Sequence, residues 1–165
     1  MRIYTDGACF PNPGNGSWSF VVLDDNEEIV FKKNSVELNT TNNRMECKAI
    51  IEAMKWVIDS NLEHIDITIY SDSQLIVNTY NTWMHKWSER GWKKKKSGVK
   101  NLDLVKELYN LKQIVNVELT WVKGHSGILG NELADYLCSS SFRNNKTPKP
   151  VEFRPRAILR KKNDI

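Results

Sequence analysis

The chain has 165 residues, enough for one domain with a buried core, and this length requires no second domain. Hydrophobic residues make up 40% and charged residues 27% of the sequence, a balance that excludes a disordered chain and a membrane-embedded one. The net charge is +4, and it is distributed unevenly along the chain.

The first part of the sequence predicts three strands and then a long helix. Three runs rich in β-formers are separated by turn residues: 2–9, 17–23 and 28–33. We expect them to form an antiparallel meander. Apolar residues then recur at helical spacing over 42–61, with Thr40 or Thr41 available as the N-cap.

The second part predicts alternating strands and helices. β-rich runs indicate strands over 65–70 and 117–122, and helical spacing indicates helices over 73–83, 101–114 and 131–142. The expected fold class is therefore α/β: a mixed five-stranded sheet, with three antiparallel strands followed by parallel strands, and helices on its faces.

Basic residues concentrate in two segments. The Pro-containing tail 146–165 carries seven Lys and Arg residues against two acids, whereas 1–145 is close to neutral, so we divide the chain there. Within 86–100, seven basic residues accompany a single acid, and tryptophans lie in or beside the segment. Cations interleaved with aromatic rings indicate contact with a nucleic acid; the alternative is a solvated charged face. The residues concerned are Trp83, Trp87, Trp92, Lys93, Lys94, Lys95 and Lys96.

Three cysteines, Cys9, Cys47 and Cys138, show neither a disulfide pattern nor metal-ligand spacing, which fits a reducing compartment. No apolar run has membrane-spanning length, and Met1 stands so close to the first strand that we expect no signal peptide. A cytoplasmic protein without membrane contact is expected. Because no heptad seam is present, we expect a monomer with no obligate protein partner.

Four carboxylates stand beside small or polar residues in elements far apart in the sequence: Asp6, Glu46, Asp72 and Asp135. Mg²⁺ prefers oxygen ligands, and two ions roughly 3.5–4 Å apart would account for four acids in phosphodiester cleavage. The alternative for each acid alone is a surface carboxylate or a helix cap. That alternative suits Glu46 and Asp72, but it suits Asp6 badly, because Asp6 lies in a β-forming run where an unpartnered charge is costly.

Five motifs in this order resemble type 1 ribonuclease H, the endonuclease that cuts the RNA strand of an RNA:DNA hybrid. They are Thr-Asp-Gly-Ala-Cys (5–9) with Asn-Pro-Gly (12–14), Thr-Thr-Asn-Asn-Arg-Met-Glu (40–46), Ser-Asp-Ser-Gln (71–74), Trp-Val-Lys-Gly-His (121–125) and Asn-Glu-Leu-Ala-Asp (131–135). The resemblance covers about residues 1–145 and extends to the family's basic protrusion, here 83–100. It implies a ribonuclease H-like fold in 1–145, and hydrolysis of the RNA strand to 5′-phosphate and 3′-hydroxyl ends.

The same resemblance assigns the catalytic metal ligands to Asp6, Glu46, Asp72 and Asp135, with two Mg²⁺ ions per active site in the presence of substrate and Mn²⁺ able to substitute. It also gives His125 a catalytic role, in shuttling a proton or in releasing a product. Glycines flank His125 and predict a mobile loop. We interpret His64 and His85 as structural or surface residues.

Substrate selection requires groups that sense a 2′-hydroxyl, and amide side chains both donate and accept hydrogen bonds. We assign this role to Asn12, Asn42, Asn43 and Gln74. Asn12 could instead be only a turn residue and Asn42 only a helix-start residue. Thr41 and Arg44 could bind a phosphate of the DNA strand. Cys9 could contact substrate through its backbone, although we favour a buried, inert thiol.

Two other functional classes remain open at this point. A transposase, resolvase or exonuclease of the same fold would share an acidic cluster, and a non-catalytic protein could bind hybrids without cutting them. The first would not be expected to combine Asn-Asn-Arg-Met-Glu (42–46) with the lysine- and tryptophan-rich arm. The second would not need four acids.

Overall fold

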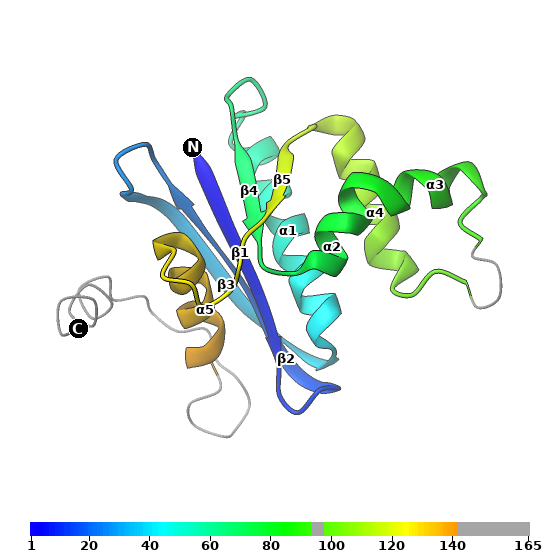
Figure 1. The fold of residues 1–165 in the computed structure, drawn as a ribbon, viewed down its shortest axis with the longest axis horizontal. Coiled ribbons are helices and arrows are strands. Elements are labelled where there is room, and N and C mark those ends of the chain that lie inside the picture. The colour runs from blue at the N-terminus through cyan, green and yellow to red at the C-terminus, as the bar shows by residue number, and fades with distance from the viewer. Residues whose placement is uncertain (94–97, 142–165) are drawn as a thin grey trace.

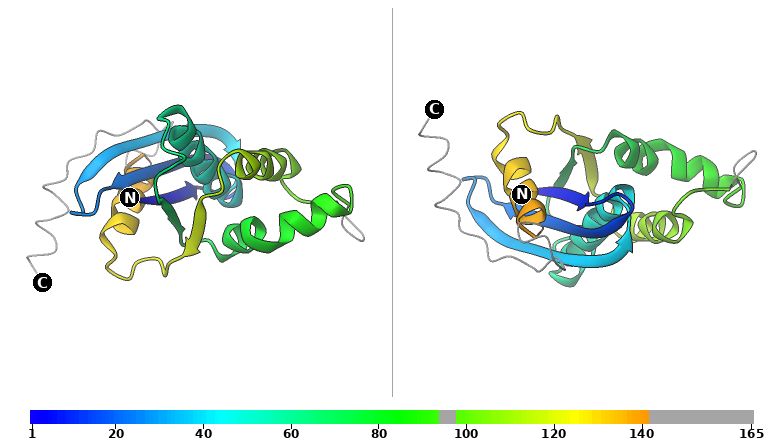
Figure 2. Two further views of the ribbon diagram at one scale, coloured as in Figure 1. Left: turned by 90° about the horizontal axis from the view of Figure 1, so that it is seen from above. Right: turned by 90° about the horizontal axis from the view of Figure 1, so that it is seen from below.

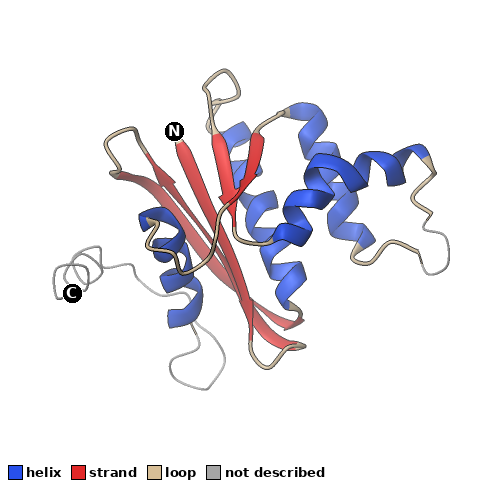
Figure 3. Ribbon diagram, in the orientation of Figure 1, coloured by secondary structure: helices blue, strands red, loops and turns tan. Residues whose placement is uncertain are grey.

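The computed structural model describes residues 1–93 and 98–141, which form one five-stranded sheet with helices on both faces (Figures 1 and 3). The strands lie in the order β3-β2-β1-β4-β5. Their bounds are β1 Arg2–Cys9, β2 Gly14–Leu23, β3 Ile29–Thr40, β4 Thr68–Ser71 and β5 Glu118–Trp121. The helices are α1 Asn42–Asp59, α2 Gln74–Asn78, the π-helix η1 Thr79–Trp83, α3 Met84–Glu89, α4 Leu102–Ile114 and α5 Leu129–Ser140.

The sheet has the predicted mixed topology. β1 pairs antiparallel with β2, and β2 with β3, whereas β1 and β4, and β4 and β5, pair in parallel. Short turns permit the first two antiparallel connections, while α1 and the α2–α4 segment supply the crossovers that parallel strands require. The predicted fold class is confirmed.

The side chains of the central strands alternate between two cores. Ile3, Phe20 and Val22 pack in the core that includes α1, α2 and α4. Tyr4 packs with the neighbouring β2 residues against α5 in a smaller cluster on the opposite face. This follows from the two-residue period of a strand, and it explains why the central strands are apolar on both faces. Figure 1 shows α5 over one face and α1 toward the other, and Figure 2 shows α3 at one end of the molecule, away from the sheet.

Several element boundaries differ from the sequence prediction. β3 runs on to Thr40 rather than stopping at Lys33, because its polar second half pairs with β2 along the edge of the sheet. β4 starts only at Thr68, since a turn in which Ile65 N–H donates to the Leu62 carbonyl precedes it. The helix predicted over 73–83 continues through a π turn to Glu89.

All three cysteines are buried and unpaired, in agreement with the sequence interpretation. Across 1–93 and 98–141, no helix is both long and apolar enough to traverse a bilayer. The proposed boundary at 145, the tail 146–165, and Lys94, Lys95 and Lys96 lie outside the described residues.

Candidate active site

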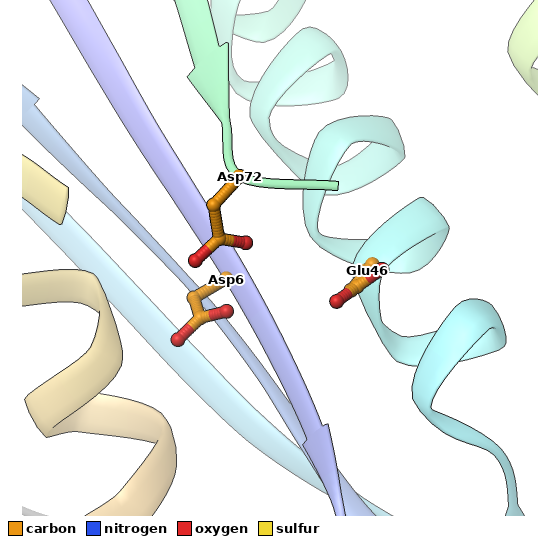
Figure 4. Close-up of side chains that lie close together, drawn as sticks. All are labelled: Asp6, Glu46 and Asp72. Atoms are coloured by element: carbon orange, nitrogen blue, oxygen red, sulfur yellow. The ribbon is translucent and has the colours of Figure 1, made fainter. Parts of the chain in front are cut away.

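Three of the four predicted acids meet at one place in the structure. Asp6 lies on β1, Glu46 in the second turn of α1, and Asp72 directly after β4. Each offers a carboxylate oxygen within 4.8 Å of those of the other two. Figure 4 shows Asp6 and Asp72 side by side and Glu46 pointing toward them from α1. The chain thus gathers hard oxygen donors from three elements, the donor type that Mg²⁺ prefers.

Parallel pairing of β1 and β4 places Asp72 beside Asp6. The register aligns Ile3 with Ile69 and Tyr4 with Tyr70, and the same offset aligns position 6 with position 72. Because β4 ends at Ser71, Asp72 lies at the carboxyl edge of the sheet, the usual location of binding residues in parallel sheets.

A close approach of α1 to β1 brings in Glu46. A Cβ atom built on Gly7 would lie 2.3 Å from the backbone nitrogen of Glu46, so only glycine permits this contact. Asp6 directly precedes Gly7 in the sequence. The close approach at Gly7 therefore brings Glu46 next to Asp6. The backbone N–H of Gly7 also donates to Asp6 Oδ1 at 2.9 Å.

Burial and mutual repulsion raise the pKa values of two of these acids. Asp6 is only 8% exposed, and its pKa is raised well above the usual value by desolvation and then by the charges of Asp72, Asp135 and Glu46. Burial raises the pKa of Glu46 to about 7, against a hydrogen bond with the Ser73 side chain that lowers it. Raised carboxyl pKa values of this kind indicate a site in which a bound proton or cation is favourable.

Asp135 lies outside the group of three but close to it. Its charge contributes to the raised pKa of Asp6, and Ser139 Oγ donates to its Oδ1 at 3.2 Å. Asp135 Oδ2 lies 3.9 Å from His125 Nδ1. The histidine side chain is 80% exposed, on a loop residue with φ of 55°. The structure therefore places Asp135 between the carboxylate group and the predicted proton carrier.

Two groups that hold Asp72 were missed by the sequence analysis. Trp121 Nε1 donates to the Asp72 backbone carbonyl at 3.1 Å, and Asn131 Nδ2 donates to Asp72 Oδ2 at 3.4 Å. Asn131 is 2% exposed and precedes Asp135 by four residues, so both share one face of α5. The four-residue spacing from Asp135 is the sequence feature from which Asn131 could have been predicted as a site residue.

Five predicted substrate residues lie around the start of α1: Asn12, Thr41, Asn42, Asn43 and Arg44. Thr41 is its N-cap, accepting from Arg44 N–H at 3.2 Å, and Asn12 Oδ1 accepts from the Asn42 N–H at 3.2 Å. The Arg44 guanidinium donates to both carboxylate oxygens of Asp103 at 2.9 and 2.7 Å and, with its hydrogen bonds, lowers the pKa of Asp103 to about 2. If Arg44 binds a phosphate as predicted, it does so with a guanidinium that is already paired with Asp103.

A cavity of about 120 Å³, here called the tryptophan groove, lies beside this helix start. Its lining includes Asn43, Leu75, Thr79, Trp83, Trp87 and Lys100. The rings of Trp83 and Trp87 are 6.2 Å apart. Trp92 instead packs edge-on against Tyr109 at 5.3 Å, while Lys93 and Gln74 are exposed.

Cys9 does not present its thiol to solvent. Its Sγ is buried and donates to the carbonyls of Pro11 and Thr40 at 3.2 and 3.4 Å. These contacts support the buried, inert interpretation of the side chain.

A larger cavity, of about 570 Å³, lies at the amino ends of β4 and β5, at the other end of β4 from Asp72. Its acids Glu63, Asp66 and Glu118 are exposed, and within the described ranges no metal-binding group of three forms there. We therefore place the candidate active site at the carboxylates of Asp6, Glu46 and Asp72, which can bind a metal ion, and not at the larger cavity.

The model of the family described as RNase H matches residues 1–143. The chain belongs to the RNase H family. A curated relative, Ribonuclease H of Treponema denticola, is 38% identical over 149 residues, covering 83% of this chain and 93% of the relative. The fold also matches that of LC9-RNase H1, described as a type 1 RNase H with the type 2 active-site motif, at a TM-score of 0.73 and 26% identity, over 96% of this chain and 79% of that one. The fold of LC11-RNase H1, solved in complex with an RNA/DNA hybrid, matches at a TM-score of 0.62 and 19% identity, over 85% of this chain and 97% of that one.

Proposed function

We propose that this member of the RNase H family is a type 1 enzyme, a metal-dependent endonuclease that hydrolyses the RNA strand of RNA:DNA hybrids and leaves 5′-phosphate and 3′-hydroxyl ends. One observation carries the proposal: the carboxylates of Asp6, Glu46 and Asp72 converge at the carboxyl edge of the sheet. Family membership supports the reaction, and the complex reported for LC11-RNase H1 supports the substrate.

The donor set fits magnesium. Three carboxylates lie close enough to share cations, Asp6 is buried among like charges, and no nitrogen or sulfur ligand belongs to the group. Asp6, Glu46, Asp72 and Asp135 would hold the ions. Two divalent cations bound there would activate the attacking water and stabilise the leaving 3′ oxygen.

Neighbouring residues orient the carboxylates that would hold the ions. Gly7 N–H and Ser73 bind the carboxylates of Asp6 and Glu46, while Asn131 and Trp121 fix the side chain and backbone of Asp72. His125, exposed and 3.9 Å from Asp135, would exchange a proton with solvent.

Recognition of the hybrid would come from two neighbouring surfaces. The amides Asn12, Asn42, Asn43 and Gln74 would contact 2′-hydroxyls and base edges of the RNA strand, with the Cys9 backbone beside them. Thr41, Arg44, Trp83 and Trp87 would bind the DNA strand along the tryptophan groove, and Trp92 with Lys93, Lys94, Lys95 and Lys96 would add further contacts to the polyanion.

The test uses a hybrid labelled separately on each strand, incubated with Mg²⁺, with Mn²⁺, or with chelator. We expect cleavage of the RNA strand only, abolished by chelator. Cleavage of DNA, or of both strands, would favour a transposase- or exonuclease-type enzyme. Chelator-resistant binding without any cleavage would favour a binding protein, and either result would refute the proposal.

We further propose that the protein acts as a cytoplasmic monomer without an obligate partner. The buried, unpaired cysteines support a reducing compartment. Sedimentation of the protein alone and with hybrid tests the oligomeric state, and a dimer that persists at nanomolar concentration would contradict it.

A further inference from the structure

The helix that follows Asp72 contains a π turn. α2 continues through η1 into α3, and the N–H of Met84 donates to the carbonyl of Thr79, five residues earlier. It thereby bypasses the carbonyl of Tyr80, which would be its acceptor in an α-helix. Single π turns inside α-helices are rare and frequently occur at functional sites.

This turn places four side chains on one face. Leu75, Thr79, Trp83 and Trp87, each four residues from the next, all line the tryptophan groove. In an α-helix each four-residue step rotates the side chain by about 40°, so three steps would rotate it by about 120°. One π turn contains one extra residue, which reduces this rotation by about 100°. The four side chains therefore point in nearly the same direction from the helix axis. The π turn therefore brings both tryptophans to the groove.

Lys112 on α4 binds the carbonyl that the π turn bypasses. Its Nζ donates to the Tyr80 carbonyl at 2.9 Å and lies 4.0 Å from the centroid of the Tyr80 ring. The same Nζ lies 3.0 Å from His85 Nε2, and burial lowers the pKa of this lysine. Asn81 Nδ2 and Tyr80 Oη also donate to carbonyls of residues 119 and 117, which attach the turn to β5 and the residue before it.

We infer that Lys112 is a positioning residue for hybrid binding: it stabilises the π turn through the Tyr80 carbonyl and so keeps Trp83 and Trp87 in the tryptophan groove. The inference rests on the proposed function. Lys112 comes from a different helix than the tryptophans, so it acts on them through the backbone of η1. Its removal would leave a backbone carbonyl without its charged donor, which favours a return to α-helical pairing and a rotation of α3.

The first test is Lys112→Met, which keeps the length and apolar body of the side chain and removes its donors. We expect Kd for a labelled hybrid, measured in chelator by fluorescence anisotropy, to rise roughly tenfold, the scale of one lost aromatic contact. KM should rise by the same factor while kcat is unchanged, because the carboxylates are not touched. The emission of the tryptophans should shift as Trp83 and Trp87 leave the groove.

Lys55→Met is the matched control. It removes the same charge together with the ion pairs of Lys55 with Glu52 and with Glu107 on α4, and Lys55 is not among the residues that line the groove. We expect its Kd and KM to equal those of the unaltered protein. Equal hybrid Kd values for the Lys112 and Lys55 variants would overturn the inference, as would a loss of kcat at constant Kd.

Deletion of Thr82, an exposed residue of η1, provides a second and independent test. Removing one residue from the π turn restores α-helical pairing without rotating the tryptophans, because the four groove positions then follow one another at spacings of four, three and four residues. The deletion variant should therefore bind the hybrid with the Kd of the unaltered protein, and Lys112→Met should cause no rise in Kd in this background, because no bypassed carbonyl remains. A rise in Kd caused by Lys112→Met in the deletion background would overturn the inference, even if Lys112→Met alone failed to fold, because Lys112 would then act without the π turn. Absence of hybrid cleavage by the unaltered protein would refute the proposed function instead, since the Kd comparison needs no cleavage.

Discussion

Asp6 is a buried carboxylate surrounded by three other acids, and its raised pKa reflects an unfavourable charge in the metal-free protein. We predict that Asp6→Asn abolishes cleavage, because a metal ligand is lost, and leaves the melting temperature in chelator unchanged or higher. Calorimetry and the hybrid assay measure the two effects. Asp59→Asn, at an exposed position at the end of α1, is the control and should alter neither. A variant at Asp6 that cleaves at the normal rate would contradict the assignment.

Glu46 makes the metal-free protein sensitive to pH. Its folded-state pKa is raised from 4.5 to about 7, so between these values the folded protein holds more protons than the unfolded chain. The free energy of unfolding in chelator should therefore fall as pH rises from 4.5 to 7, by on the order of 3 kcal/mol.

Melting curves across this pH range, with chelator and with Mg²⁺, test the prediction for Glu46. Bound Mg²⁺ should raise the melting temperature and most strongly at high pH, where protons no longer compete. Glu46→Gln should flatten the metal-free pH dependence. A metal-free protein whose stability rises over this interval would disprove the electrostatic account.

His125 has an exposed ring whose Nδ1 lies 3.9 Å from Asp135 Oδ2. We predict that His125→Ala lowers kcat about 10²-fold, the scale of general acid–base assistance, without eliminating cleavage. The pH–rate profile should change, because a group that carries a proton during the reaction is lost. A profile identical to that of the unaltered protein would argue against proton transfer and leave product release as its role.

At the scale of elements, we assign the basic segment that follows α3 in sequence to substrate binding and not to the chemical step. Substitution of Lys93, Lys94, Lys95 and Lys96 by Gln should weaken hybrid binding and flatten the dependence of log Kd on log salt, because fewer counterions are released. The cleavage rate in saturating hybrid should stay unchanged, because the carboxylates on β1, α1 and after β4 remain in place. Measured salt slopes of equal steepness would show that these lysines do not bind phosphates.

Considered as a whole molecule, the sheet and its helices contain every proposed metal ligand within 1–141, and the RNase H family match ends at residue 143. We predict that a fragment of residues 1–145 folds with the melting temperature of the full chain and cleaves hybrid with the same kcat. Any contribution of the basic tail 146–165 would then appear only in KM at low salt. A fragment that fails to fold would move the domain boundary beyond 145.

Local patterns in the sequence predicted much of this fold. β1 has the predicted bounds, α1 begins at the predicted residue with Thr41 as its N-cap, and α4 and β5 agree within one residue at each end. These features depend on side-chain periodicity and capping, which neighbouring residues supply. The mixed sheet followed from the order of the elements.

The sequence by itself determined which acids, amides and tryptophans are available and on which elements they lie. Only the tertiary structure decided that three acids lie within 4.8 Å while Asp135 stands outside that group, that β3 extends to Thr40, and that Lys112 meets the bypassed carbonyl of Tyr80. The physical reason is that these features depend on strand register, on the close approach at Gly7 and on hydrogen bonds between distant segments. Such contacts exist only after the chain has folded, and they override local propensity where the two differ.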